Sequence, residues 1–104
     1  MLRQDAFNFQ ATGAQTPSLA LGEASPGFCG IILAIDTEGV HGGLPADELE
    51  RRLLEMGLVE GAKVEVRHQG LIRRDPIAVR INDRATFALR RREAAAIFVV
   101  PEAG

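Results

Sequence analysis

The chain has 104 residues, which is enough for one small domain and too few for two ordinary ones. Its longest uncharged apolar run, residues 28–35, is far shorter than the roughly 20 residues that a membrane-spanning helix needs. The net charge of −2 is unevenly distributed, with one basic and six acidic residues up to Glu48 and eleven basic and eight acidic residues after it, so the chain lacks the basic balance typical of nucleic-acid-binding domains.

Residues 1–16 combine Gly, Ala, Gln and Thr with little apolar periodicity, and we expect them to form a disordered tail. Phe7 and Phe9 are the exception, because their alternation also fits an edge strand that docks on the domain. The segment lacks the basic and continuous apolar parts of a secretion signal, which predicts a cytoplasmic protein. The folded domain is predicted to span residues 17–101, and residues 102–104 form a second short tail.

The first predicted strand covers residues 28–36, where the continuous apolar character predicts burial on both faces. A Gly-rich loop over residues 37–45 follows it. The next segment is predicted to be a helix that ends at Met56, because Leu49, Leu53 and Met56 fall on one helical face.

Both ends of this helix carry local signals. Asp47 is followed three residues later by Glu50, which is the spacing of an N-cap residue and its N3 partner. Gly57 suits the left-handed residue that follows a helix, and Leu58 would then contact Leu53 as in a Schellman motif.

The following strands are predicted from an alternation with period two. The first of them covers residues 63–67, and the second starts at Asp75-Pro76 after a loop over residues 68–74. Asn82-Asp83 reverse the chain before the third strand, since both residues tolerate left-handed geometry. The residues expected to face inward are Val64 and Val66, then Ile77, Val79 and Ile81, then Ala85, Phe87 and Leu89.

Residues 91–96 suit one helical turn, and residues 97–100 form a closing strand that Pro101 ends. The pattern amounts to about five short strands with one helix inserted after the first strand. A small closed β-barrel requires this arrangement, and closure removes the open edges of a short sheet. The predicted fold class is therefore mainly β.

Four segments resemble, in order and spacing, the ferrous iron transport protein A (FeoA) family. They are LALGEASPG (residues 19–27), LLEMGLVEGAKVEV (53–66), DPIAVRI (75–81) and FALRRREAAAIFV (87–99), which together cover most of the chain. The resemblance implies a small SH3-like β-barrel that is cytosolic, has no catalytic activity and accompanies the membrane ferrous iron permease of the Feo system. The sequence departs from the family at Arg74, where a glycine commonly precedes the Asp-Pro pair.

The sequence contains no convincing catalytic constellation. Ser18, Ser25 and Cys29 lie in no nucleophile motif, and Cys29 is expected to be a packed thiol because its strand is apolar. Lys63 is the only lysine and precedes a strand rather than a helix, so it does not belong to a nucleotide-binding P-loop. The chain is therefore predicted to be no enzyme and to hold no cofactor.

His41 and His68 are the only histidines and the weak candidates for metal ligands. They lack the spacing that would place two ligands on one face of an element. A transition metal that bridges two molecules through His41 or His68 and a carboxylate is the expected adventitious case.

A partner-binding site is predicted at Leu71, Ile72, Arg73 and Arg74, in the loop before the Asp-Pro pair. Two branched aliphatic residues beside two arginines are typical of a binding loop that combines an apolar anchor with charge. In the alternative interpretation, Leu71 and Ile72 fold back over the end of the barrel and have a structural role.

The sequence thus predicts a non-enzymatic cytosolic accessory of bacterial ferrous iron uptake, which binds and modulates a FeoB-type permease or its cytosolic GTPase domain. It would reach the membrane only through the permease, and the sequence leaves a homodimer open. The alternative is the same SH3-like domain in a metal-dependent transcriptional regulator or another small interaction module. A nucleic-acid-binding barrel is disfavoured, because the arginine clusters come without Tyr or Trp residues for base stacking.

Overall fold

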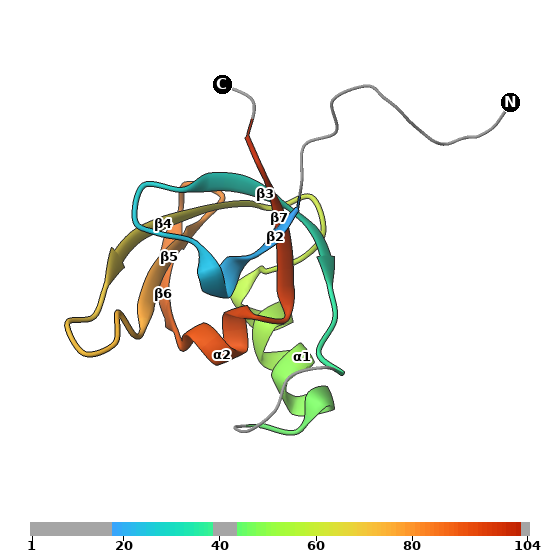
Figure 1. The fold of residues 1–104 in the computed structure, drawn as a ribbon. Helices are drawn as coiled ribbons and strands as arrows, with labels where there is room; N and C mark the ends of the chain where they lie inside the picture. The colour runs from blue at the N-terminus through green and yellow to red at the C-terminus, as the bar shows by residue number, and fades with distance from the viewer. Residues whose placement is uncertain (1–17, 39–43, 103–104) are drawn as a thin grey trace, which may run out of the picture.

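Six antiparallel strands, in the order β2-β7-β3-β4-β5-β6, form one curved sheet in the computed structural model, which describes residues 18–38 and 44–102 (Figure 1). The strands are β2 (Leu19–Ala20), β3 (Cys29–Ile35), β4 (Lys63–Gln69), β5 (Ile77–Ile81), β6 (Ala85–Leu89) and β7 (Ile97–Pro101). A 3₁₀ turn, η1 (Leu21–Glu23), and two helices, α1 (Ala46–Met56) and α2 (Arg91–Ala94), accompany them. The predicted mainly β class is confirmed, with α1 after the first long strand. The additional strand β2 has only two residues, too few to show a period in the sequence.

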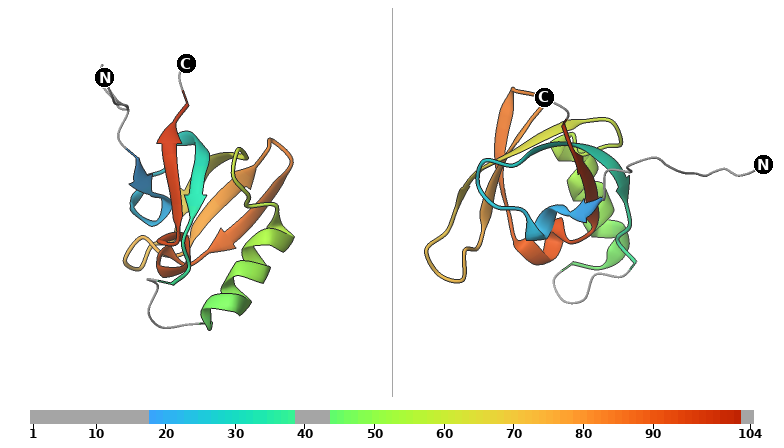
Figure 2. Two further views of the ribbon diagram at one scale, coloured as in Figure 1. Left: turned by 90° about the vertical axis from the view of Figure 1, so that its right-hand side faces the viewer. Right: turned by 45° about the horizontal axis from the view of Figure 1, so that its top comes forward.

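The sheet curls around a single apolar core, and α1 and α2 lie together at one end of it (Figure 2). The core takes side chains from the sheet, from η1 and from α1. Its largest fully buried members are Leu21, Ile32, Leu49, Leu53, Leu58, Val64, Val66, Ile77, Val79, Leu89, Ile97 and Val99. These side chains come from segments far apart in the chain, so burial of this core joins the elements into one unit.

Helix α1 buries Leu49 and Leu53 and packs Met56 against the core, which confirms the predicted apolar face. The predicted N-cap at Asp47 is wrong, because the helix already begins at Ala46 and Pro45 is its N-cap residue. The fixed φ of Pro45 sets the chain up for the helix one residue earlier. Asp47 lies in the first turn, where its negative charge still favours the helix N-terminus.

The predicted end of α1 is confirmed in detail. Gly57 has a φ of 92°, and its N–H donates to the carbonyls of Leu53 and Leu54. The N–H of Leu58 donates to the carbonyl of Leu53 at 2.9 Å, and both of these leucine side chains are fully buried. The helix therefore stops in a Schellman motif that directs the chain back toward the sheet.

The β4–β5 hairpin follows the predicted alternation but is longer than expected. Val64, Val66, Ile77, Val79 and Ile81 are all buried, as predicted. The predicted loop over residues 68–74 is wrong at its start, because β4 continues to Gln69 after a register shift between Val66 and His68. Strand β5 begins at Ile77, directly after the Asp75-Pro76 pair that was predicted to open it.

Two predicted orientations are also wrong. Ala85 is exposed, since it lies on the edge strand β6, where Phe87 is partly buried and only Leu89 is fully buried. Leu33 is 54% exposed, although β3 was expected to be buried on both faces. A register shift between Ile32 and Ala34 breaks the pairing with β7 at this residue.

The segments after β5 have the predicted type of structure, although the bounds of α2 and β7 differ from the prediction. Asn82 and Asp83 have φ values of 52° and 59°, which confirms the left-handed reversal. Helix α2 is two residues shorter than the predicted turn, and β7 includes Pro101.

None of the helices within residues 18–38 and 44–102 is long and apolar enough to cross a membrane. The predicted tail over residues 1–16, with Phe7 and Phe9, and most of the Gly-rich loop lie outside the described residues.

Candidate partner-binding site

The loop between β4 and β5 is a narrow projection from the barrel (Figure 1). Its base is closed by a hydrogen bond of 2.9 Å from the Gly70 N–H to the Pro76 carbonyl. A Cβ atom at Gly70 would meet the backbone oxygen of Asp75, so the two sides of the loop approach closely only because residue 70 is glycine. The closed base holds residues 71–74 outside the barrel.

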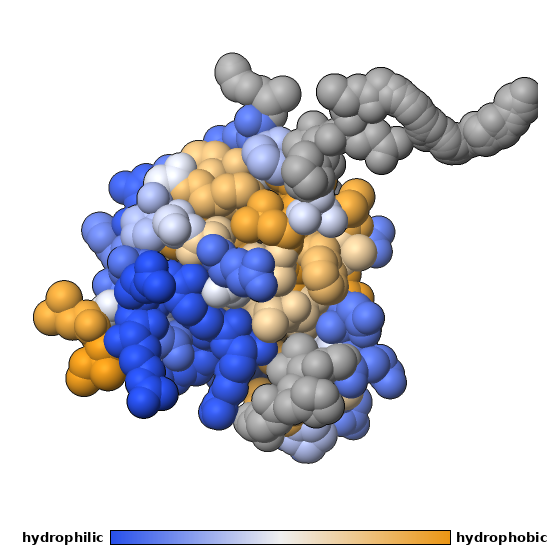
Figure 3. All heavy atoms as spheres, viewed as in Figure 1, coloured by the Kyte–Doolittle hydropathy of each residue, from blue (hydrophilic) through white to orange (hydrophobic). Residues whose placement is uncertain are grey.

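Leu71 and Ile72 are exposed to 101% and 80% of their reference areas. The interpretation in which they fold back over the barrel end is therefore wrong, because the closed base of the loop keeps them away from the core. Figure 3 shows an apolar projection at the position of this loop, next to a strongly hydrophilic surface. Two adjacent aliphatic side chains with this exposure lose contact with water only when another molecule covers them.

Arg73 and Arg74 follow, and both have a φ of 58°. The left-handed conformation costs a residue with a Cβ atom about 1–2 kcal/mol, so two such residues in succession need support from their surroundings. Part of that support comes from Arg91, whose Nε donates to the carbonyl of Arg74 at 2.7 Å.

Arg91 connects three segments that are distant in the sequence. Its Nη1 donates to the carbonyls of Gly22 and Ala24 at 2.9 and 2.8 Å, and its Nη2 donates to Oε1 of Gln69 at 2.9 Å. Its backbone N–H donates to Oδ1 of Asp75 at 2.8 Å. Arg91 thereby fixes the β4–β5 loop against η1 and α2. The sequence showed Arg91 only as the middle of three arginines, and nothing in that run marks one of them as the connector.

A hollow with a volume of about 290 Å³ opens between η1 and this loop. It is lined by Gly22, Glu23, Ser25, Arg73, Arg74 and Arg91. Of the predicted site residues, the structure thus brings Arg73 and Arg74 to one side of a basic hollow and places Leu71 and Ile72 beside it. Within the described part of the chain, none of the three lining guanidinium groups has a carboxylate within 4.0 Å.

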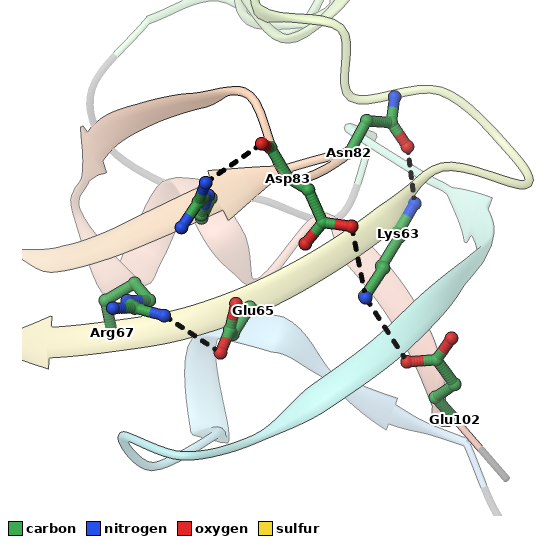
Figure 4. Close-up of polar contacts among 7 residues, drawn as sticks. Lys63, Glu65, Arg67, Asn82, Asp83 and Glu102 are labelled. Atoms are coloured by element: carbon green, nitrogen blue, oxygen red, sulfur yellow. Dashed lines mark hydrogen bonds and ion pairs between the residues drawn. The ribbon is translucent and has the colours of Figure 1, made fainter. Parts of the chain in front are cut away.

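Two basic residues of β4, Lys63 and Arg67, are paired with carboxylates of the barrel itself (Figure 4). Lys63 Nζ lies 3.3 Å from Oδ2 of Asp83 and 3.9 Å from Oε1 of Glu102, and Asp83 raises the pKa of this lysine through a hydrogen bond and its charge. Arg67 Nη1 lies 3.1 Å from Oε2 of Glu65. These charges offset one another on the protein itself, in contrast to those around the hollow.

The structure does not assemble the other sequence candidates into a site. His68 lies exposed on β4, and His41 is outside the described residues. Among the described residues, no group of three His, Cys, Asp or Glu side chains could hold a metal ion. Cys29 is partly buried, and desolvation together with the Glu65 carboxylate raises the pKa of its thiol. A raised pKa favours the less reactive protonated thiol.

The family model of the FeoA domain matches residues 19–101 of this chain. The chain belongs to the FeoA domain family. This membership links it to ferrous iron transport, and it confirms the predicted family and the absence of enzymatic activity, because FeoA is a non-catalytic accessory domain. None of the curated proteins compared with the chain matches it significantly.

Solved structures of FeoA proteins are similar to this chain. FeoA from Chlorobium tepidum is 31% identical, with a TM-score of 0.65 over 83% of this chain and 72% of that protein. FeoA from Stenotrophomonas maltophilia, which was solved with zinc and is described as a procaryotic SH3 domain protein, is 28% identical, with a TM-score of 0.61 over 83% of this chain and 89% of that protein. The predicted SH3-like fold is thereby confirmed.

The fold also occurs in larger proteins. A manganese-dependent transcriptional repressor matches 86% of this chain with a TM-score of 0.66 and 21% identity, and the match covers 44% of the repressor. At this identity the likeness shows the fold alone.

Proposed function

We propose that this FeoA-family protein is a cytosolic, non-enzymatic accessory of ferrous iron uptake that binds a FeoB-type permease through its cytosolic GTPase domain. The observation that carries the proposal is the projecting loop, in which the exposed Leu71 and Ile72 stand beside arginines that have no carboxylate within 4.0 Å among the described residues. An apolar anchor next to unpaired charge is the combination that binding hot spots use. The description of the Stenotrophomonas maltophilia protein as a candidate activating factor of ferrous iron transport supports a role on the transporter.

Calorimetry with the purified cytosolic domain of the permease tests this proposal. Leu71→Asp is expected to weaken binding about tenfold or more, because it removes the apolar anchor. Arg73→Glu combined with Arg74→Glu is expected to act similarly by reversing the local charge. Leu54→Asp is the matched apolar control, since Leu54 is 53% exposed on α1.

Arg84→Glu controls for charge reversal at an exposed arginine away from the loop. Circular dichroism separates loss of binding from loss of folding. If folded loop variants bind as tightly as the parent, the loop is no contact site. The exposed face of α1, with Arg51, Arg52 and Glu55, is then the next surface to test.

The second candidate function is that of an SH3-like module in a metal-dependent transcriptional regulator. It is favoured by the structural likeness to the manganese-dependent repressor alone. Sequence-dependent DNA binding at physiological salt would support this candidate over the permease.

A further inference from the structure

The guanidinium group of Arg91 is held rigidly and yet keeps its full charge. All four hydrogen bonds that it donates within the described residues go to neutral acceptors, namely the carbonyls of Gly22, Ala24 and Arg74 and the amide oxygen of Gln69. An arginine has five side-chain N–H donors, so one Nη2 donor is left over. A fixed cation with a remaining donor binds an anion without the usual loss of side-chain entropy.

The other groups around the hollow add to this preference for an anion. Arg73 and Arg74 contribute two more cations, and the hydroxyl of Ser25 is a neutral donor. Glu23 is the one acidic residue among the six that line the hollow, so cations outnumber anions three to one. The volume of about 290 Å³ is at the small end for a ligand site and suits a single oxyanion group with its attachment.

We propose that this hollow is an oxyanion site that receives the carboxylate of an acidic side chain on the partner protein. The inference rests on the proposed function for the identity of the partner. A carboxylate matches the planar fork of an arginine side chain, and the apolar pair Leu71-Ile72 lies in the same loop as two of the three cations. The recognised element is therefore an acidic residue beside an apolar patch. Glu23 also lines the hollow, and its negative charge repels a bound carboxylate, which limits the affinity of the site.

Nuclear magnetic resonance titrations with glutarate and with inorganic phosphate, at constant ionic strength, measure the anion preference directly. Glutarate is expected to shift the backbone amide signals of Ser25, Arg74 and Arg91 in a saturable way in the millimolar range. Arg74→Gln should weaken glutarate binding, so that the shifts saturate at a higher glutarate concentration, and Arg51→Gln, on the exposed face of α1, should leave the binding unchanged. Arg91 itself is avoided as a probe, because its loss would also loosen the loop.

Glu23→Gln provides a test by gain of binding. It is expected to strengthen binding of both glutarate and the permease domain by about two- to fivefold, the effect of removing one exposed like charge. Arg74→Gln should weaken both by a similar factor. A variant that gains affinity is necessarily folded, so this result does not depend on a stability control.

The outcomes separate the two proposals. If glutarate binds at the hollow and the parent chain does not bind the permease domain, the anion site stands and the proposed function fails. If the permease domain binds but glutarate causes no saturable shifts and Glu23→Gln has no effect, the oxyanion site is overturned and the proposed function stands. Saturable binding of phosphate without binding of glutarate overturns the carboxylate assignment in favour of a free phosphate.

Discussion

Among the described residues, Arg91 makes more side-chain hydrogen bonds between distant segments than Arg90 or Arg92, its neighbours in the run of three arginines. Its side chain donates hydrogen bonds to the η1 segment and to both sides of the β4–β5 hairpin. Arg91→Ala is expected to destabilise the fold by about 2 kcal/mol, because two of the acceptors it leaves, the carbonyls of Gly22 and Ala24, are partly buried. For a domain of this size, the melting temperature should fall by roughly 8–16 °C.

The neighbouring exposed residue Arg92 offers the control for this experiment. Arg92→Ala should leave the melting temperature nearly unchanged, since Arg92 is exposed in the same four-residue helix. Equal melting temperatures for the Arg91→Ala variant and the parent would contradict the connecting role of Arg91.

Gly57 is required by its backbone conformation rather than by the space around it. A Cβ atom at this position would meet only Cγ2 of Ile81, at an ordinary distance of 3.7 Å, so space is not the constraint. The φ of 92° is the constraint, and Gly57→Val should destabilise the protein by at least about 1–2 kcal/mol in thermal melts. Glu60→Val in the adjacent turn is the control, because the φ of Glu60 is not positive. A Gly57→Val variant as stable as the control would refute this explanation.

At the scale of elements, the β4–β5 loop combines a strained backbone with an exposed surface. Arg74→Gly should relieve the left-handed strain and raise the free energy of unfolding by about 0.5–1 kcal/mol, while weakening partner binding. Arg84→Gly, in the reversal after Asn82-Asp83, should instead lower stability, because the φ of Arg84 is not positive. Thermal melts and calorimetry on both variants distinguish the two effects. A loss of stability in the Arg74→Gly variant would show that the loop is not strained.

The elements that the sequence predicted well are those whose signals are local. Gly57 and Leu58 end α1 through contacts within six residues, and Asn82-Asp83 reverse the chain by their own conformational preferences. Leu33 was misassigned because its exposure depends on a register shift against β7, a strand more than sixty residues away. Exposure of Leu71 and Ile72 likewise depends on a close approach between the two ends of their loop, which residue types alone do not specify. The sequence therefore identified the loop residues of the site, but not the hollow that Arg91 forms with η1.

At the scale of the whole molecule, the fold brings charged residues from the acidic first half and the basic second half of the chain to the same hollow. The basic second half supplies all three arginines of the hollow, whereas its Lys63 is paired with Asp83 and Glu102. The acidic first half supplies Glu23 to the same hollow. A net charge of −2 therefore coexists with a local basic site, and attraction to an acidic partner follows from the local arrangement rather than from the net charge.

We also propose that residues 17–101, together with Glu102, suffice for the fold. Among the described residues, the fully buried core members lie between Leu21 and Val99, and the Glu102 N–H donates to the carbonyl of Cys29 at 3.0 Å. Removal of residues 1–16 should therefore change the melting temperature by only a few degrees. Removal of residues 98–104 should prevent cooperative melting, because it deletes most of β7, the strand between β2 and β3. A decrease of more than about 8 °C on removing residues 1–16, which for this size means over 1 kcal/mol, would show that the first segment contributes to the folded domain.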